Sequence, residues 1–244
     1  EAGLVYFTDG ERELALISVD AIGVTALDVD RIRQRVPSMH PKDILVSATH
    51  THSAPDTLGL WGPTWFGVVP RRSGVDRDWW YPTLDRLGDA LESLRRSARP
   101  AQVRSTPVDI EADWTRNDRE KGGRFDHALA FQFVEVETDA PICTVLNFAS
   151  HPEALWSDNT LISADFPGHF RRSIRQRVGG EALYISGPLG GMLTPNVDQH
   201  ANFETRRDYI ASLGRHLAER TIEALNEATA EPCPTIEHGW TPLH

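Results

Sequence analysis

The sequence predicts an α/β fold built on mixed β-sheets, with two packed sheets flanked by helices as one possible arrangement. Near-continuous apolar runs such as Leu14–Val19 are typical of strands that are buried on both faces. Other segments carry apolar residues at helical spacing. Several neighbouring strands lack a helix between them, which argues against a purely doubly wound sheet. At 244 residues the chain can bury a full core.

The N-terminal part is predicted to contain a strand–helix–strand unit. Apolar runs predict strands over 4–7, 14–19 and 44–46, and helical spacing predicts a helix over 26–36 that stops before Pro37. The order of the second strand, the helix and the third strand is that of a βαβ unit.

Residues 57–75 are rich in Gly, Pro and Trp, and two interpretations stay open for them. The segment could shape a pocket for an apolar ligand, or it could be a loop that packs over the sheet. A long helix over 78–99 should follow, because Trp80, Leu84, Leu87, Leu91 and Leu94 form one apolar stripe that ends before Pro100. This stripe is expected to face the core.

The second half alternates strands and helices less regularly. We expect a charged loop over 111–126. The predicted strands are 101–110, 129–136, 142–149 and 182–185, and the predicted helices are 166–178 and 203–225, with another strand opening at Thr235.

Composition narrows the class of function. The chain has 25 basic and 35 acidic side chains, a net charge of −10, which argues against a nucleic-acid partner. No apolar run has the length of a transmembrane segment, and no signal-peptide pattern stands at residue 1. Cys143 and Cys233 lie far apart, form no Cys-x-x-Cys site and leave the redox compartment open; Cys143 is expected to be a core thiol.

Two histidines follow the strand 44–46 at positions i and i+2. In an extended backbone alternate side chains share a face, so His50 and His52 are expected to point the same way. Such a pair suits a metal ion, or one metal ligand beside one proton carrier. The alternative is a pair of surface histidines in a polar loop.

Polar clusters follow two further strands, which favours a shared site over scattered surface residues. Ser150–Glu153 comes after the strand 142–149, and the Gly- and Pro-rich Gly187–Asn196 comes after 182–185. Ligands of open α/β sheets bind at the carboxyl ends of the strands. A catalytic zinc takes three protein ligands and keeps one open position, and His50 and His151 can supply two of the three. His52 could then move protons or bind substrate.

The Gly-rich segment offers two further groups. Its backbone N–H groups could approach a developing oxyanion. Thr194 could present its hydroxyl as a nucleophile or hydrogen-bond partner, or it could simply be a turn residue before Pro195.

Three segments taken in order resemble the neutral/alkaline non-lysosomal ceramidase family. They read ATHTHS at 48–53, NFASHP at 147–152 with NTLISADFPG at 159–168, and TPN at 194–196. The resemblance runs from about Leu4 to Asn196. It implies hydrolysis of the amide of an N-acylsphingosine with one zinc ion, and places this function within sphingolipid metabolism.

The resemblance also implies roles for individual residues. His50 and His151 would be zinc ligands, His52 would lie in the active site, and Thr194 would take the place of a serine implicated in catalysis. A substrate-binding arginine would correspond to Arg116 or Arg119, with Arg116 preferred here. The family's remaining ligands, a Glu and a Tyr, belong to later segments, and nothing before His244 matches them.

Departures from the family pattern affect the expectation that ceramide is the substrate more than the expectation of a metal-dependent hydrolase. Asp56 stands where the family has Gly, and could be an extra ligand or a turn residue. Gly191 stands where an Asp is common. Asp165 could cap the following helix or contact substrate in the site. Asp56, Glu153 and Asp165 are the candidates for a third ligand within this chain.

We therefore expect a zinc-dependent hydrolase that cleaves an amide in a ceramide-like or other N-acyl substrate by metal-activated water. The alternatives are a ceramidase-like binding module or pseudo-enzyme with an incomplete metal site, and a metal-dependent esterase. By resemblance, residues 1–244 form a single N-terminal domain of a longer protein, further polypeptide completes the site, and the protein is secreted or periplasmic.

Overall fold

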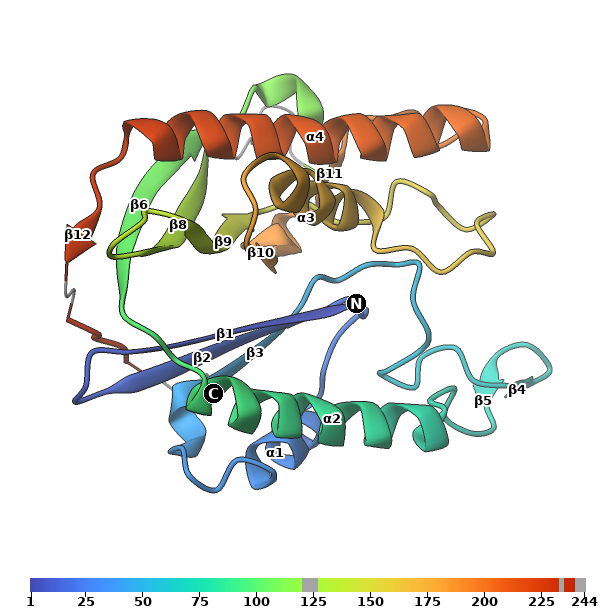
Figure 1. Cartoon of the computed structure of the whole chain (residues 1–244). Coiled ribbons are helices and arrows are strands. Elements are labelled where there is room, and N and C mark those ends of the chain that lie inside the picture. The colour runs from blue at the N-terminus through green and yellow to red at the C-terminus, as the bar shows by residue number, and fades with distance from the viewer. Residues whose placement is uncertain (120–126, 233–234, 240–244) are drawn as a thin grey trace.

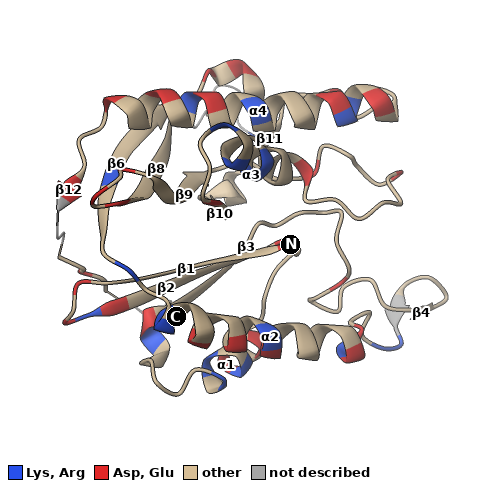
Figure 2. Ribbon diagram, viewed as in Figure 1, with Lys and Arg blue, Asp and Glu red and all other residues tan. Residues whose placement is uncertain are grey.

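The computed structural model describes residues 1–119, 127–232 and 235–239. The helices and sheets of this part of the chain form four layers (Figure 1). Helices α1 and α2 cover one sheet, helices α3 and α4 cover another, and the two sheets face each other between them. The predicted α/β class is confirmed, with mixed sheets packed together and flanked by helices. Acidic and basic residues lie along the outer helices, as Figure 2 shows.

The first sheet carries the N-terminal half of the chain. It consists of β1 (Ala2–Thr8), β2 (Glu13–Val19) and β3 (Ile44–Ala48) in that order, with β1 antiparallel and β3 parallel to β2. Helix α1 (Ala26–Gln34) connects β2 to β3, so the predicted βαβ unit is present. Thr25 and Asp28 form a reciprocal capping box at its start. A 3₁₀ turn, η1 (Pro41–Asp43), leads into β3.

Helix α2 (Arg77–Arg96) packs beside α1 on this sheet. The apolar stripe predicted from the sequence faces inward, and Trp80, Leu84 and Leu91 are fully buried.

The second sheet has five strands and is also mixed. Its order is β10 (Glu181–Ser186), β9 (Pro141–Phe148), β8 (His127–Glu135), β6 (Ala101–Asp109) and β12 (Glu231–Pro232). Only β9 and β10 run parallel, because α3 (Asp165–Arg177) connects them. Helix α4 (Phe203–Glu227) packs on α3 and reaches over to β6.

A small apolar cluster joins the two sheets. Val5 of the first sheet packs with Cys143, Val145 and Leu183 of the second. The Ser18 hydroxyl adds a hydrogen bond across the same junction, to the carbonyl oxygen of Tyr184. Burial raises the pKa of the Cys143 thiol to about 12, as expected for the core thiol that the sequence predicted. Cys233 lies outside the described residues.

Two parts of the chain differ from the prediction. The predicted loop 111–126 begins with η2 (Ala112–Trp114) and β7 (Thr115–Asn117), and β7 pairs with β11 (Leu193–Pro195), which follows η3 (Leu189–Gly191). Strands this short carry no readable periodicity. The expected strand at Thr235 is wrong for residues 235–239, because the Ile236 N–H donates to the Asp9 carboxylate instead of joining a sheet.

The segment 57–75 is anchored to the body of the molecule at both ends, where Thr57 is buried and Val75 packs against the core of the first sheet. It forms a hairpin of β4 (Thr64–Trp65) and β5 (Val69–Pro70) that projects from the body of the molecule (Figure 1). The side chains of Trp61, Trp65 and Phe66 are exposed. Among the described helices, none has both the length and the apolarity to cross a bilayer.

Candidate active site

Three histidines from two different sheets lie together. His50 and His52 follow β3, and His151 follows β9. The ring centroid of His50 is 5.0 Å from that of His52 and 5.1 Å from that of His151, and the third separation is 5.9 Å. We call these three residues the histidine cluster. The sequence-based expectation that His50 and His151 share a site agrees with this geometry.

The backbone brings His50 and His52 together by a different route from the predicted one. Strand β3 ends at Ala48, and His50 has a left-handed backbone with φ of 66°. The alternation of an extended strand therefore does not explain their shared direction. Thr49 and Thr51 are fully buried instead, and the Thr51 hydroxyl donates to the carbonyl oxygen of Ser163. A non-glycine residue held in this region is strained, a feature that gathers at functional sites.

The surroundings fix the tautomers of two of the imidazoles. Nδ1 of His50 lies 2.6 Å from the carbonyl oxygen of Ile22, and Nδ1 of His151 lies 2.7 Å from that of Leu193. A carbonyl oxygen only accepts, so each Nδ1 carries the proton and each neutral ring keeps its lone pair on Nε2. Metal-binding histidines are commonly oriented in this way. The donor set of His50 and His151 therefore fits a metal ion.

His52 has a different partner. Its Nδ1 lies 3.4 Å from Oε2 of Glu153, which is largely buried. Burial lowers the pKa of His52, the Glu153 carboxylate opposes this effect, and His50 and His151 add to the lowering. The net direction is downward, so the ring favours the neutral form that can accept a proton.

Thr194 lies next to His151 through strand β11. The carbonyl oxygen of Leu193 accepts from both the backbone N–H and the ring of His151. The Thr194 hydroxyl is buried, and among the described residues it has no hydrogen-bond partner. A role for this hydroxyl in the reaction stays a prediction.

Arg116 holds the segment that carries Thr194. Its Nη1 donates to the carbonyl oxygens of Pro195 at 3.1 Å and Val197 at 2.8 Å, and its Nε donates to Asp118. The alternative arginine, Arg119, is exposed. The substrate contact that the resemblance implies for Arg116 stays a prediction.

Asp165 is buried at the start of α3, with φ of 56°. The helix cap is Ala164, so Asp165 is the first helical residue and not the cap. One carboxylate oxygen accepts from the Phe166 N–H at 2.7 Å, whereas the other makes no well-aligned bond within the described residues. Burial raises its pKa to about 7, against the lowering effect of the amides of Phe166, Ala154 and Leu155. Its assignment to substrate binding stays a prediction.

Asp56 organises a turn. Its carboxylate accepts backbone N–H groups from Leu58, Gly59 and Trp61. These bonds lower its pKa although burial acts in the opposite direction. Because both oxygens are engaged, the turn role accounts for Asp56. Over residues 1–119, 127–232 and 235–239, no three or more His, Cys, Asp or Glu side chains are grouped to hold a metal ion.

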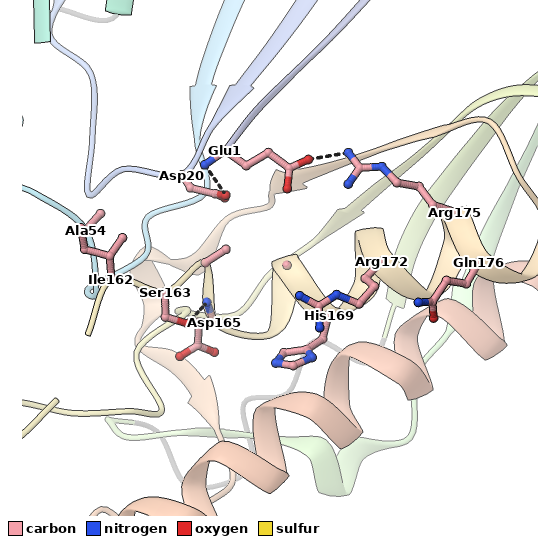
Figure 3. A pocket seen from close by; sticks show the side chains of 12 residues that line it. Glu1, Asp20, Ala54, Ile162, Ser163, Asp165, His169, Arg172, Arg175 and Gln176 are labelled. Atoms are coloured by element: carbon pink, nitrogen blue, oxygen red, sulfur yellow. Dashed lines mark hydrogen bonds and ion pairs between the residues drawn. The ribbon is translucent and has the colours of Figure 1, made fainter. Parts of the chain in front are cut away.

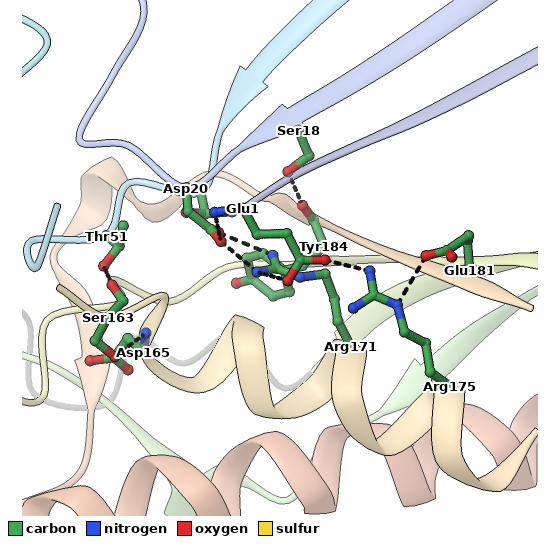
Figure 4. Close-up of polar contacts among 11 residues, drawn as sticks. Glu1, Ser18, Asp20, Thr51, Ser163, Asp165, Arg171, Arg175, Glu181 and Tyr184 are labelled. Atoms are coloured by element: carbon green, nitrogen blue, oxygen red, sulfur yellow. Dashed lines mark hydrogen bonds and ion pairs between the residues drawn. The ribbon is translucent and has the colours of Figure 1, made fainter. Parts of the chain in front are cut away.

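A cleft of about 660 Å³ lies beside the cluster, between the end of β2 and the outer side of α3 (Figure 3). Its lining includes Asp20, Ser163, Asp165, His169 and Arg172, but no member of the histidine cluster. Figure 4 shows the hydrogen bond from Thr51, which lies between His50 and His52 in the chain, to Ser163 of the cleft lining. Of the predicted site residues, Asp165 is the one that lines this cleft.

Two solved structures of ceramidases have a fold similar to that of this chain. The chain aligns with neutral ceramidase from Pseudomonas aeruginosa with a TM-score of 0.70 and 16% identity, over 88% of this chain and 37% of that one. A ceramidase complexed with C2 aligns with a TM-score of 0.65 and 16% identity, over 88% of this chain and 36% of that one. No protein-family model and no curated protein sequence matches.

These similarities show a ceramidase-like fold. At this identity they do not carry the activity, and the chain spans little more than a third of the length of the ceramidases that it matches.

The sequence predicted the three histidines as site residues, but it did not predict that Glu153 contacts His52. The contact between His52 and Glu153 joins two loops that are far apart in the chain. The only available signal was a carboxylate two residues after His151, within a polar cluster at the end of a strand.

Proposed function

We propose that this protein is a metal-dependent hydrolase of the neutral ceramidase type, which uses one zinc ion to cleave an amide bond in a ceramide-like or other N-acyl substrate. The observation that carries the proposal is the histidine cluster, in which Nε2 of His50 and of His151 is free for a metal. The ceramidase-like fold supports it.

The residues of the histidine cluster would have different roles in the reaction. His50 and His151 would hold the ion through Nε2. Bound zinc would supply a Lewis acid that polarises the substrate carbonyl and lowers the pKa of water. His52 accepts a proton from the attacking water at Nε2 and passes it to the leaving amine, while Glu153 stabilises the imidazolium. The unpartnered Thr194 hydroxyl is available to donate to the developing oxyanion.

Metal content tests the first half of the proposal. We expect the purified chain to bind zinc weakly in equilibrium dialysis, and His50→Ala and His151→Ala each to lose most of this binding. His200→Ala, in the exposed turn before α4, is the matched control and should keep the wild-type zinc content. Zinc retained by the His50→Ala/His151→Ala double variant would contradict the assignment.

A substrate panel tests the reaction. N-acyl amides of sphingoid and simpler amines are compared with esters of the same acyl chains, using zinc-loaded protein. Faster cleavage of the amides supports an amidohydrolase, whereas turnover of esters alone would favour a metal-dependent esterase.

A second candidate function is a binding module that has lost catalysis. It is favoured by the finding that, within the described residues, no three His, Cys, Asp or Glu side chains are placed to hold a metal ion together. We propose that further polypeptide supplies the missing ligand, so the 244-residue chain alone should bind zinc weakly and turn over slowly. Robust turnover by this chain alone would refute that part, and an active longer protein would refute the binding module.

A further inference from the structure

The hairpin that follows the histidine segment gathers exposed apolar side chains. Of the thirteen large hydrophobic residues that are exposed in the described part, six lie within residues 58–68: Leu58, Leu60, Trp61, Trp65, Phe66 and Val68. Single exposed hydrophobic residues are normal, but a contiguous group marks an interaction surface. We call these six residues the apolar tip.

A rigid neck presents the apolar tip. A Cβ on Gly62 would lie 1.9 Å from the carbonyl oxygen of Arg72, so the two arms approach as closely as backbones can. The Arg71 N–H donates to the Pro63 carbonyl oxygen at 2.9 Å, and the Asp56 carboxylate holds the first arm through three amides. The exposure therefore belongs to a hydrogen-bonded element with a defined direction.

Phe66 occupies a position that its residue type normally avoids. The Val68 N–H donates to the Trp65 carbonyl oxygen, and the two central residues of this turn have positive φ, 52° for Phe66 and 73° for Gly67. Turns of this kind select Asn, Asp or Gly at the first of these positions. Phe66 is strained there, and it is 95% exposed, so no packing in this chain compensates. Persistent local strain of this kind points to a function.

The charge around the apolar tip is opposite to that of the whole chain. Residues 57–75 contain no Asp or Glu and include Arg71 and Arg72, which are exposed, in a chain of net charge −10. Figure 2 shows that the helices, in contrast, carry acidic and basic residues mixed together. Trp and Phe beside arginines match the interface of a membrane, where aromatic rings enter the headgroup region and cations meet anionic lipids.

We propose that the apolar tip docks this protein on an anionic lipid bilayer by inserting Trp65 and Phe66 into the interface. The tip is convex and projects from the body, a shape suited to entering a fluid phase. A second exposed apolar pair, Leu161 and Ile162, lies in the loop that the Ser163 N–H ties to the carbonyl oxygen of Ser53, beside the histidine cluster. The docking does not rest on the proposed hydrolysis.

Vesicle co-sedimentation with the full chain tests the proposal. The vesicles are phosphatidylcholine alone, and phosphatidylcholine with about a quarter phosphatidylserine. We expect binding to the anionic vesicles, at least about tenfold weaker binding for Phe66→Asn, and little change for Leu27→Asn, which replaces a leucine on α1 that is 81% exposed. Asn suits the turn, so Phe66→Asn should fold at least as well as the wild type.

Two further measurements make the outcome decisive. Trp fluorescence of the bound protein should shift to the blue and be quenched by brominated lipid, and Arg71→Gln/Arg72→Gln should remove the preference for phosphatidylserine. Equal binding by wild type and Phe66→Asn would overturn the proposal. Absence of vesicle binding by the wild type would overturn it too. If size-exclusion chromatography then showed wild-type oligomers and a monomeric Phe66→Asn variant, the apolar tip would be a contact between copies of the chain.

Discussion

The three imidazoles of the histidine cluster differ in what holds their Nδ1 atoms. Backbone carbonyls hold His50 and His151, whereas a carboxylate holds His52. A carboxylate stabilises the imidazolium form much more than a neutral carbonyl does. His52 is therefore the member suited to carry a proton, and the other two are oriented to serve as ligands through Nε2.

Glu153→Gln tests this division of roles. If the proposed hydrolysis holds, removing the charge should lower kcat by roughly 10- to 100-fold, because the general base loses its orienting carboxylate, with KM and zinc content unchanged. His52→Ala should also keep zinc and lose hydrolysis. Exposed Glu137→Gln is the control. Loss of zinc from Glu153→Gln would make Glu153 a ligand instead.

Asp165 should give the protein a recognisable pH dependence. Its pKa is raised from 3.8 to about 7 in the folded state, so between these values the folded protein holds a proton that the unfolded chain has released. The stabilisation that this bound proton contributes is complete below about pH 4 and is lost as pH rises through about 7. The resulting decrease in the free energy of unfolding is at most on the order of 4 kcal/mol.

Asp165→Asn lacks this titration. In urea unfolding, the free energy of unfolding of the wild type should fall relative to that of the variant between about pH 4 and 7. Above about pH 7 the difference between the two proteins should stay constant. Parallel curves for the two proteins across this range would show that the buried carboxyl is already ionised.

Sequence reasoning at the residue scale found side chains but not their contacts. The motifs named His50, His52, His151 and Thr194 because these residue types follow strands. The left-handed backbone of His50 and the link between His52 and Glu153 depend on how two sheets meet, which no local pattern encodes.

At the scale of elements, periodicity located every long helix and strand to within a few residues. The apolar stripe predicted over 78–99 became α2 (Arg77–Arg96), and the helix predicted over 203–225 became α4 (Phe203–Glu227). The short pair β7 and β11, which positions Thr194, was missed because it consists of three residues on each side. Long-range pairing, and not local propensity, makes such strands.

The helix pairs on both outer layers touch at a glycine. A Cβ at Gly214 of α4 would lie 2.5 Å from Cβ of His169 and 2.6 Å from the carbonyl oxygen of Phe166, both in α3. On the other side, a Cβ at Gly88 of α2 would lie 2.4 Å from Cβ of Arg35 at the end of α1. Close helix packing explains these two glycines inside helices, where glycine is otherwise unfavourable.

Gly214→Ala should therefore destabilise the protein although alanine favours helices. We expect the overpacking cost of about 1–3 kcal/mol to exceed the gain of about 1 kcal/mol in helix propensity, and Tm to fall. Gly190→Ala, where a Cβ meets nothing within 4 Å, should leave Tm nearly unchanged. A higher Tm for Gly214→Ala would mean that α3 and α4 can move apart at no cost.

At the scale of the whole molecule, a buried ion pair connects the two halves. Arg171 of α3 donates to Asp20, at the end of β2, through Nη1 at 3.1 Å and Nη2 at 2.5 Å (Figure 4). Both side chains are almost fully buried, at 4% and 6% exposure. Asp20 also accepts from the hydroxyl of Thr49, the residue before His50. The pair thus ties the second helical layer to the segment that carries the cluster.

Breaking this pair from one side should cost far more than removing both charges. Arg171→Met removes the buried cation of Asp20 and leaves that carboxylate only the part-exposed N-terminal ammonium of Glu1, 3.2 Å away. We expect a loss of roughly 3 kcal/mol in the free energy of unfolding. Asp20→Asn/Arg171→Met should recover a large part, because the buried carboxylate is removed together with its cation. The matched control is Arg31→Met, which breaks a similar two-point contact with Asp85 at the surface. Solvent screens this pair, so its loss should cost far less than the loss of the buried one. Equal losses for Arg171→Met and Arg31→Met would show that water reaches Asp20, and that the apolar contacts between the sheets suffice to hold the two halves in register.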